Sequence, residues 1–169
     1  IMQKLKQLGK PVVFICMSGS AIAFNWEAAN TSAIIQAWYG GQETGTALAD
    51  ILFGRYNPSG KLPITFYKSD ADLPDFNDYS MKNRTYRYFT GDVLYPFGYG
   101  LSYTSFKYKD LEVPSLIQTG DSVRVKVAVK NTGKVEGEEV VQLYLSHKKI
   151  AQEAPNCQLA RFQKVKLKP

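Results

Sequence analysis

Acidic side chains are the first candidates for chemistry in this sequence, because two carboxyl groups that face one another can act as a general acid and a general base. Asp70, Asp72, Asp75 and Asp78 lie within one short polar stretch. Nothing in their spacing places two of these carboxylates face to face. The sequence therefore favours solvent-exposed loop residues over a catalytic pair.

Two glutamates have a structural explanation. Glu27 and Glu43 are expected near the starts of helices. Unpaired backbone N–H groups and the helix dipole stabilise a carboxylate at that position. This role is sufficient for both residues, so neither one is predicted to be catalytic.

Thiol, imidazole and phosphate-binding chemistry find little support. Cys16 lies in an apolar run and Cys157 in a distant polar stretch, which favours two free thiols, and His147 is the one histidine of the chain. A cysteine nucleophile needs a neighbouring base, and a zinc site needs several His or Cys ligands. Gly40 and Gly41 are not followed by the Lys-Ser/Thr pair of a phosphate-binding loop. No cofactor and no metal site is predicted.

The bulk composition indicates a globular chain that binds neither nucleic acid nor a membrane. The 169 residues are 44% hydrophobic and 21% charged, with a formal net charge of +6. The lysines of the second half alternate with apolar residues, as Lys164 and Lys166 do, which is typical of the solvent face of a strand. The longest apolar run is Val12–Met17, far shorter than the roughly 20 residues that span a bilayer.

Residues 1–66 have the pattern of a parallel α/β fold. The spacing predicts the tail of a helix up to Leu8, apolar strands at Pro11–Met17 and Ala33–Trp38, and a helix at Glu43–Phe53 that ends at Gly54. Continuous apolar strands are typical of parallel sheets that are covered on both faces. We therefore expect the two strands to be parallel neighbours, buried on both faces and covered by the helix.

The carboxyl ends of these two strands are the expected ligand crevice, because open α/β sheets bind ligands there. Four residues of the loops that follow the strands are candidates for substrate binding: Ser18, Gly19, Gln42 and Glu43. A second interpretation is that the glycines of these loops serve only to make tight turns from strand to helix.

Residues 104–169 change to the alternation of a half-buried antiparallel sheet. Val123, Val125, Val127 and Val129 share one face, and three further strands are expected at 106–113, 141–145 and 165–167. Four strands are fewer than the roughly seven of an immunoglobulin-like sandwich, so the module is expected to be incomplete. The predicted fold class is α/β, with a partial parallel sheet and covering helices, followed by a truncated all-β immunoglobulin or fibronectin III-like sandwich.

Residues 67–103 form the expected linker between the two domains, and they are rich in aromatic residues and glycine. Seven rings lie within Tyr86–Tyr103. These rings are expected either to stack on sugars or to pack the linker onto both domains, and the glycines and proline of Tyr95–Gly100 suit a rigid, close-fitting connection.

Several stretches, taken in order, resemble glycoside hydrolase family 3, the family of β-glucosidases and β-xylosidases. They are Ala37–Gly54, Asn57–Phe66, Asn83–Phe89, Tyr95–Phe106 and Gly137–Tyr144. The combination of order and spacing is specific, although each stretch alone is weak. The resemblance covers nearly the whole chain. One departure is Gly40, where proline is common in the family.

The resemblance implies an exo-acting enzyme that hydrolyses terminal β-linked sugars with retention. Members of the family have a barrel with an aspartate nucleophile, an α/β domain with a glutamate acid/base, and often a fibronectin III-like module. Retention uses two carboxyl groups roughly 5 Å apart. The resemblance places the barrel, the nucleophile and the acid/base outside this segment. It leaves glucose and xylose open as the sugar, and implies a periplasmic or secreted parent protein.

Two other functions remain open on parts of the sequence. The aromatic linker (residues 67–103) and the β-module (residues 104–169) suit a non-catalytic carbohydrate-binding or adhesion module, and residues 1–66 alone suit a flavodoxin-like binding domain. Only the enzyme segment accounts for all of the family-like stretches. Because both domains are expected to lack elements that cover their cores, we expect a segment produced alone to self-associate through apolar faces and open sheet edges.

Overall fold

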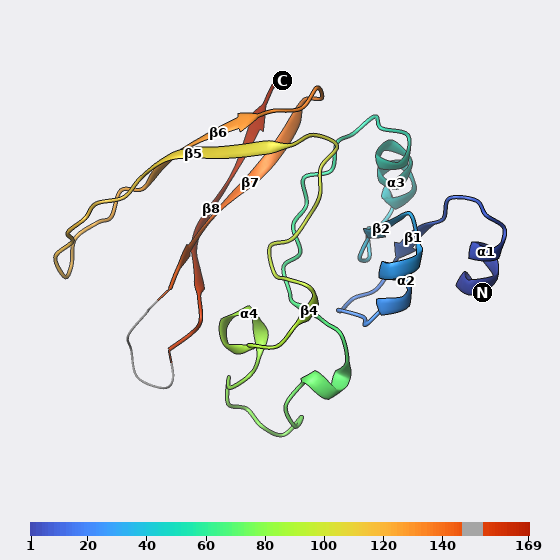
Figure 1. Cartoon of the computed structure of the whole chain (residues 1–169), viewed down its shortest axis with the longest axis horizontal. Helices are drawn as coiled ribbons and strands as arrows, with labels where there is room; N and C mark the ends of the chain where they lie inside the picture. The colour runs from blue at the N-terminus through green and yellow to red at the C-terminus, as the bar shows by residue number, and fades with distance from the viewer. Residues whose placement is uncertain (147–153) are drawn as a thin grey trace.

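The computed structural model describes residues 1–146 and 154–169 (Figure 1). Its N-terminal part alternates short helices and strands in the predicted order. The elements are α1 (Met2–Gln7), β1 (Val13–Cys16), α2 (Asn25–Asn30), β2 (Ala33–Gln36) and α3 (Thr44–Leu52). Gly9 and Gly54 follow α1 and α3 with φ of +66° and +71°. Both are in the left-handed conformation that commonly ends a helix.

β1 and β2 are parallel neighbours, as predicted. Val13 pairs with Ala33 and Cys16 pairs with Gln36. Their apolar, β-branched side chains favour extended backbone, and α2 provides the crossover that a parallel pair requires. The two strands therefore end at the same edge, with the loops at 17–20 and 37–43 beside one another.

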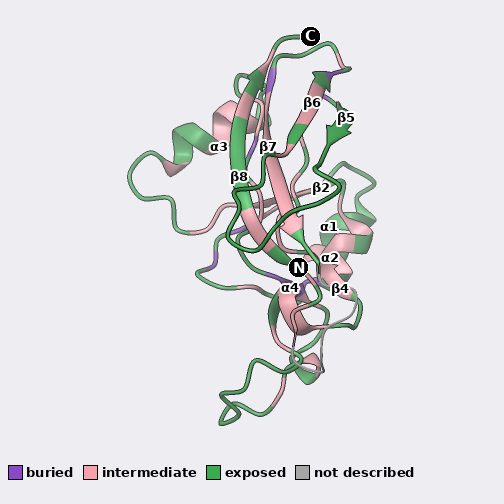
Figure 2. Cartoon of the chain, turned by 90° about the vertical axis from the view of Figure 1, so that its left-hand side faces the viewer, coloured by how far each residue is buried: buried purple, intermediate pink, exposed green. Residues whose placement is uncertain are grey.

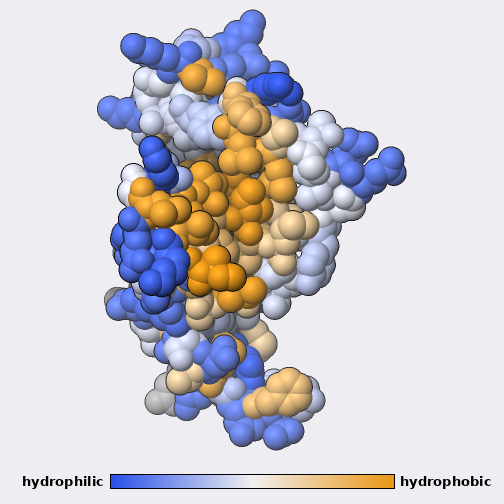
Figure 3. Space-filling view, turned by 90° about the vertical axis from the view of Figure 1, so that its right-hand side faces the viewer, coloured by the Kyte–Doolittle hydropathy of each residue, from blue (hydrophilic) through white to orange (hydrophobic). Residues whose placement is uncertain are grey.

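The prediction that both strands are buried on both faces is wrong. Cys16 is the one residue of β1 and β2 that is buried, and Val13 is 42% exposed. α2 packs against β2. Among the described residues, the pair has no further strand beside it. Figure 3 shows the resulting apolar surface on the side of these elements.

Aromatic rings form the core and join the N-terminal elements to the middle of the chain. Phe66 is fully buried, and Phe24 and Cys16 are each 5% exposed. The ring centroid of Phe24 lies 5.8 Å from that of Phe66 and 6.1 Å from that of Tyr95. Offset and tilted pairs of this kind add to the free energy gained by burying the rings.

The predicted linker folds back on its own beginning. It contains β3 (Phe66–Tyr67), a short 3₁₀ helix (Asp70–Asp72), α4 (Thr85–Tyr88) and β4 (Val93–Tyr95). β3 and β4 pair in antiparallel fashion, with Phe66 opposite Tyr95. A predicted domain boundary after residue 66 falls inside β3, because the return of the chain supplies the second strand that β3 needs.

The last part of the chain consists of antiparallel strand pairs. β5 (Phe106–Glu112) pairs with β6 (Lys126–Asn131), and β7 (Gly137–Leu145) pairs with β8 (Gln158–Leu167). In β6 the two valines are half-buried while Lys126 and Lys130 are exposed, as the alternation predicts (Figure 2). β6 begins at Lys126, so Val123 and Val125 precede it, and Val123 is 48% exposed.

Candidate functional site

Ser18 ties together the loop that follows β1 and the end of β2. Its hydroxyl donates a hydrogen bond to the carbonyl of Ser20 at 2.8 Å and accepts one from Nε2 of Gln36 at 3.1 Å. The residue is only 7% exposed. Its hydroxyl is therefore engaged in holding the loop, and a ligand would have to displace one of these partners to reach it.

Gly19 allows an aromatic ring to approach the same loop. A Cβ at this position would lie 2.9 Å from Cε2 of Tyr39, a separation at which the ring would have to shift. Tyr39 itself is 76% exposed, so its ring covers the glycine while it remains open to solvent. The structure thus brings Ser18, Gly19 and Tyr39 together at the carboxyl ends of the two strands.

Gln42 and Glu43 lie at the start of α3 and are exposed. Glu43 is the residue before the helix, and its side chain makes no capping hydrogen bond. The turn is instead held by Thr44, whose hydroxyl donates to the carbonyl of Gly41 at 2.7 Å, while Gly41 has a φ of +68°. Among the described residues no hydrogen bond links Gln42 or Glu43 to Ser18, so their role in binding stays a prediction.

Sequence reasoning missed Gln36. Its Oε1 atom is buried and has no hydrogen-bond partner among the described residues, while its Nε2 atom binds Ser18. A buried amide oxygen without a partner is costly and marks a position where a donor is expected. The sequence does contain a signal that could have identified Gln36, because it is the one polar residue within the apolar run Ala33–Trp38.

The aspartates that follow β3 shape turns. Carboxylate oxygens of Asp72, Asp75 and Asp78 accept backbone N–H groups of Ser69, Asn77 and Ser80 at 3.0, 2.8 and 2.8 Å. The hydrogen bonds from Ser80 lower the pKa of Asp78. These contacts are those of local turns and caps, so the structure supports the interpretation as loop residues over that of a catalytic pair.

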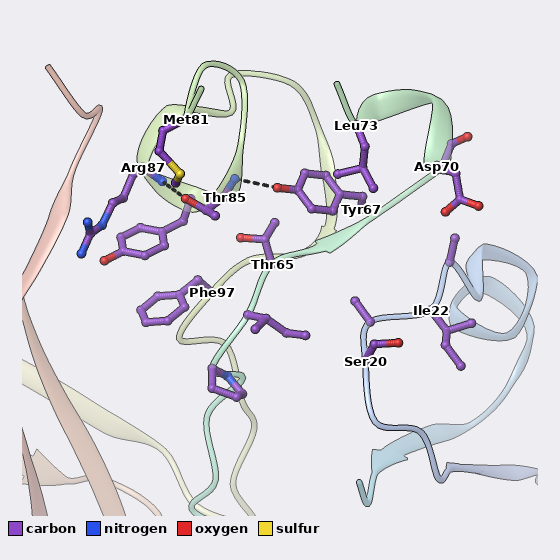
Figure 4. A pocket seen from close by; sticks show the side chains of 16 residues that line it. Ser20, Ile22, Thr65, Tyr67, Asp70, Leu73, Met81, Thr85, Arg87 and Phe97 are labelled. Carbon is purple, nitrogen blue, oxygen red and sulfur yellow. Dashed lines mark hydrogen bonds between the residues drawn. The ribbon is translucent and has the colours of Figure 1, made fainter. Parts of the chain in front are cut away.

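A hollow of about 460 Å³ lies next to the loop that follows β1 (Figure 4). Its wall runs from Ser20 and Ile22 to Tyr67, Asp70, Arg87 and Phe97. Tyr67 is held in place because its hydroxyl accepts the backbone N–H of Thr85 at 2.7 Å. Asp70 is the one carboxylate of the lining. Since retaining hydrolysis uses two carboxyl groups, the hollow by itself does not supply a catalytic pair.

Two aromatic residues of the predicted linker, Tyr86 and Phe97, pack on the β-module. Tyr86 and Phe97 stack with their ring centroids 4.2 Å apart and their planes 12° apart. Tyr144 of β7 meets both rings edge-on, at 6.0 and 6.4 Å. Their faces are used for this internal packing, which favours the interpretation of a rigid connection over an open sugar-stacking platform.

Residues 1–146 and 154–169 contain neither a metal-binding cluster nor a membrane-spanning helix. No group of three or more His, Cys, Asp or Glu side chains in that part of the chain could hold a metal ion. No helix described there is long and apolar enough to cross a membrane. Cys16 and Cys157 are free thiols, and His147 lies outside the described residues.

Comparison with known proteins identifies the family. Residues 1–103 match the model of the glycosyl hydrolase family 3 C-terminal domain. The chain is 54% identical over 144 residues, 85% of its length, to a xylan 1,4-beta-xylosidase of Xylanibacter ruminicola. It is 42% identical over 98% of its length to a periplasmic beta-glucosidase of Salmonella typhimurium. The chain spans 16% of the first protein and 23% of the second.

Solved structures are also similar over nearly the whole chain. Beta-glucosidase 3B from Thermotoga neapolitana, in complex with alpha-D-glucose, matches 99% of this chain with a TM-score of 0.88 and 35% identity. A beta-D-glucoside glucohydrolase from Trichoderma reesei matches 99% with a TM-score of 0.89 and 32% identity. The chain covers 26% and 28% of these structures. From the matched family model and these similarities, we conclude that the chain belongs to glycosyl hydrolase family 3.

Proposed function

We propose that this chain serves as the C-terminal part of an exo-acting retaining β-glycosidase that removes terminal β-linked glucose or xylose. The observation that carries the proposal is the match to beta-glucosidase 3B over 99% of the chain, because it includes the connection between the α/β elements and the β-module. A protein that used only one of these parts would not need to keep their connection.

The proposed architecture has three parts. Residues 1–66 belong to an α/β sandwich domain, residues 67–103 form an aromatic, glycine-rich linker, and residues 104–169 belong to a fibronectin III-like sandwich. The parallel pair β1–β2 and the antiparallel pairs β5–β6 and β7–β8 support this division. The pairing of β3 with β4 makes the linker a folded segment of the protein and not a flexible tether.

In this proposal the catalytic carboxylates come from other parts of the enzyme, a barrel domain in particular. Asp72, Asp75 and Asp78 are engaged in turns and caps, and Asp70 is the one carboxylate that lines the hollow. Ser18, Gly19, Gln42 and Glu43 would line the edge of the sugar site at the carboxyl ends of β1 and β2. Ser18 and Gly19 would act there by shaping the loop, since Ser18 is buried and Gly19 packs on Tyr39.

The proposed location of the parent protein is the periplasm or the extracellular space. One relative that is 42% identical over 98% of this chain is named a periplasmic beta-glucosidase. Enzymes of this family that attack polysaccharide fragments are often periplasmic or secreted, which supports this location.

The test compares the purified chain with the same chain joined to the barrel domain expected in its reading frame, on aryl β-glucosides and aryl β-xylosides. We expect activity only from the longer protein, because a retaining enzyme needs both carboxyl groups. Turnover by the chain alone, abolished by changing one of its own acidic residues, would contradict the assignment of the catalytic pair to other domains. A reading frame without a barrel would favour a carbohydrate-binding or adhesion module instead.

A further inference from the structure

The segment between α3 and β3 makes a dense set of polar contacts with the β-module. Asn57 uses both ends of its amide. Its Nδ2 donates to the carbonyl of Glu136 at 3.0 Å, and its Oδ1 accepts the hydroxyl of Ser102 at 2.9 Å and the backbone N–H of Tyr103 at 2.8 Å. One side chain thus joins the start of β7 to the chain that leads into β5.

Glu138 of β7 accepts hydrogen bonds from residues on either side of Asn57. Its Oε2 accepts the hydroxyls of Tyr56 at 3.3 Å and Ser59 at 3.2 Å, and also Nζ of Lys164 from the neighbouring strand β8 at 3.2 Å. Lys164, Ser59 and Tyr56 all favour the ionised carboxylate, and together they lower the pKa of Glu138. The carboxylate is therefore charged at neutral pH and able to hold both hydroxyls.

Glycines allow the backbones to come close at this junction. A Cβ on Gly137 would lie 2.7 Å from Nδ2 of Asn57, and a Cβ on Gly100 would lie 2.2 Å from the carbonyl oxygen of Gly60. Lys61 donates from Nζ to the carbonyl of Gly100 at 2.9 Å. Side chains larger than hydrogen at Gly100 or Gly137 would force the two surfaces apart.

The same segment reaches back to α3. Backbone N–H groups of Arg55 and Tyr56 donate to the carbonyl of Asp50 at 2.8 and 3.1 Å, which closes the end of the helix. The hydroxyl of Tyr103 donates to the carbonyl of Ile51 at 2.6 Å. The carbonyls of a last helical turn otherwise have no partner within the helix. α3 is therefore anchored at its C-terminal end by the residues that contact β7.

We infer that residues 56–61 form an internal docking clasp through which the β-module holds α3, and with it the loop at Gly41–Glu43 where α3 begins. α3 and β7 then open as one cooperative unit and not as parts of two independent domains. The inference does not depend on the proposed hydrolytic activity, since it concerns contacts within this chain alone. It assigns to the β-module the task of fixing the position of a helix outside it.

The test is amide hydrogen exchange on the whole chain carrying Asn57→Asp. This change keeps the shape of the side chain and its acceptor oxygen, but removes the donor to Glu136. We expect exchange to rise at least about fivefold in both α3 and β7, the change that loss of one ordinary hydrogen bond produces. The matched control is Asn25→Asp, because Asn25 also donates to a backbone carbonyl, that of Lys68 at 2.7 Å, outside the clasp. It should leave exchange in β7 unchanged.

A second variant guards against an effect of the added charge in Asn57→Asp. Glu138→Gln removes a charge and weakens the bonds to Tyr56 and Ser59, and it too should raise exchange in α3, while Glu112→Gln on β5 should not. Faster exchange in β7 with unchanged exchange in α3, in both clasp variants, would show that the two parts open independently and would overturn the inference.

Discussion

Lys61 and Glu139 form an ion pair that links the clasp to the third residue of β7. Nζ of Lys61 lies 3.1 Å from Oε2 of Glu139, and the two side chains are only 15% and 13% exposed. The other carboxylate oxygen of Glu139 accepts the hydroxyl of Tyr108 from β5 at 2.8 Å. One carboxylate therefore joins the clasp, β5 and β7. Among the ion pairs of the described residues, this pair has the least exposed side chains.

Glu139→Gln should destabilise the protein by more than about 1 kcal/mol, because removal of one member of a largely enclosed ion pair leaves the charge of Lys61 without its counterion. The measurement is chemical denaturation followed by circular dichroism. Glu112→Gln is the matched control. Glu112 pairs with Lys126 at a similar distance of 3.1 Å, but both side chains are more than 60% exposed. The control should cost less than about 1 kcal/mol, and equal costs would show that burial of the Lys61 pair adds nothing.

Tyr108 should make the stability of the protein depend on alkaline pH. Burial of its hydroxyl, together with the hydrogen bond to Glu139 and the charge of that carboxylate, raises the pKa of Tyr108. A raised pKa in the folded state means that the stabilisation is complete below the pKa of an unfolded tyrosine, about 10, and decreases as the pH rises above it. In the Tyr108→Phe variant, the free energy of unfolding should decrease less steeply with rising pH. Tyr39→Phe, at an exposed ring, should not, and identical pH profiles for all three proteins would refute the prediction.

Gly98→Ala should push the linker (residues 67–103) away from β7. Gly98 has a φ of +79°, and a Cβ there would lie 2.2 Å from Oε1 of Gln142 and 2.6 Å from the hydroxyl of Tyr144. Gly120→Ala is the control, since Gly120 has a φ of +96° with nothing within 4 Å of the added carbon. Backbone strain alone should cost the control about 1–2 kcal/mol, and overpacking should add about 1–3 kcal/mol at Gly98. Melting temperatures of the two variants measure the difference, and similar values would mean that Gln142 and Tyr144 move aside freely.

The apolar side of the N-terminal elements should drive self-association of the purified chain. Leu52 and Phe53 at the end of α3 are 44% and 77% exposed. Figure 3 shows apolar residues gathered in the middle of the side on which the N-terminal elements lie. Exposed apolar patches and free strand edges both favour association. Light scattering should show a mass that increases with concentration and falls after Phe53→Asp. Leu116→Asp, at an 84% exposed residue of the distant β5–β6 connection, serves as the control. A monomer at all concentrations would contradict the prediction.

The local structure of this protein could be predicted from its sequence because short-range preferences decide it. Apolar β-branched runs predicted β1 and β2, and the spacing of apolar residues at 43–53 predicted α3. The alternation of valine and lysine predicted β6. The glycines after α1 and α3 ended both helices, since a left-handed residue stops the ladder of hydrogen bonds. The order of the family-like stretches also pointed to the family that the comparisons identified.

What the sequence could not determine was which distant residues meet. The bond from Gln36 to Ser18 and the pairing of β3 with β4 depend on contacts between residues far apart in the chain. So do the exposure of β1 and β2 and the place of Glu139 beside Lys61. Periodicity reports which face of an element is apolar, but not which surface covers it. Burial, pairing of charges and access to the candidate loops are decided only when the tertiary structure brings separate elements together.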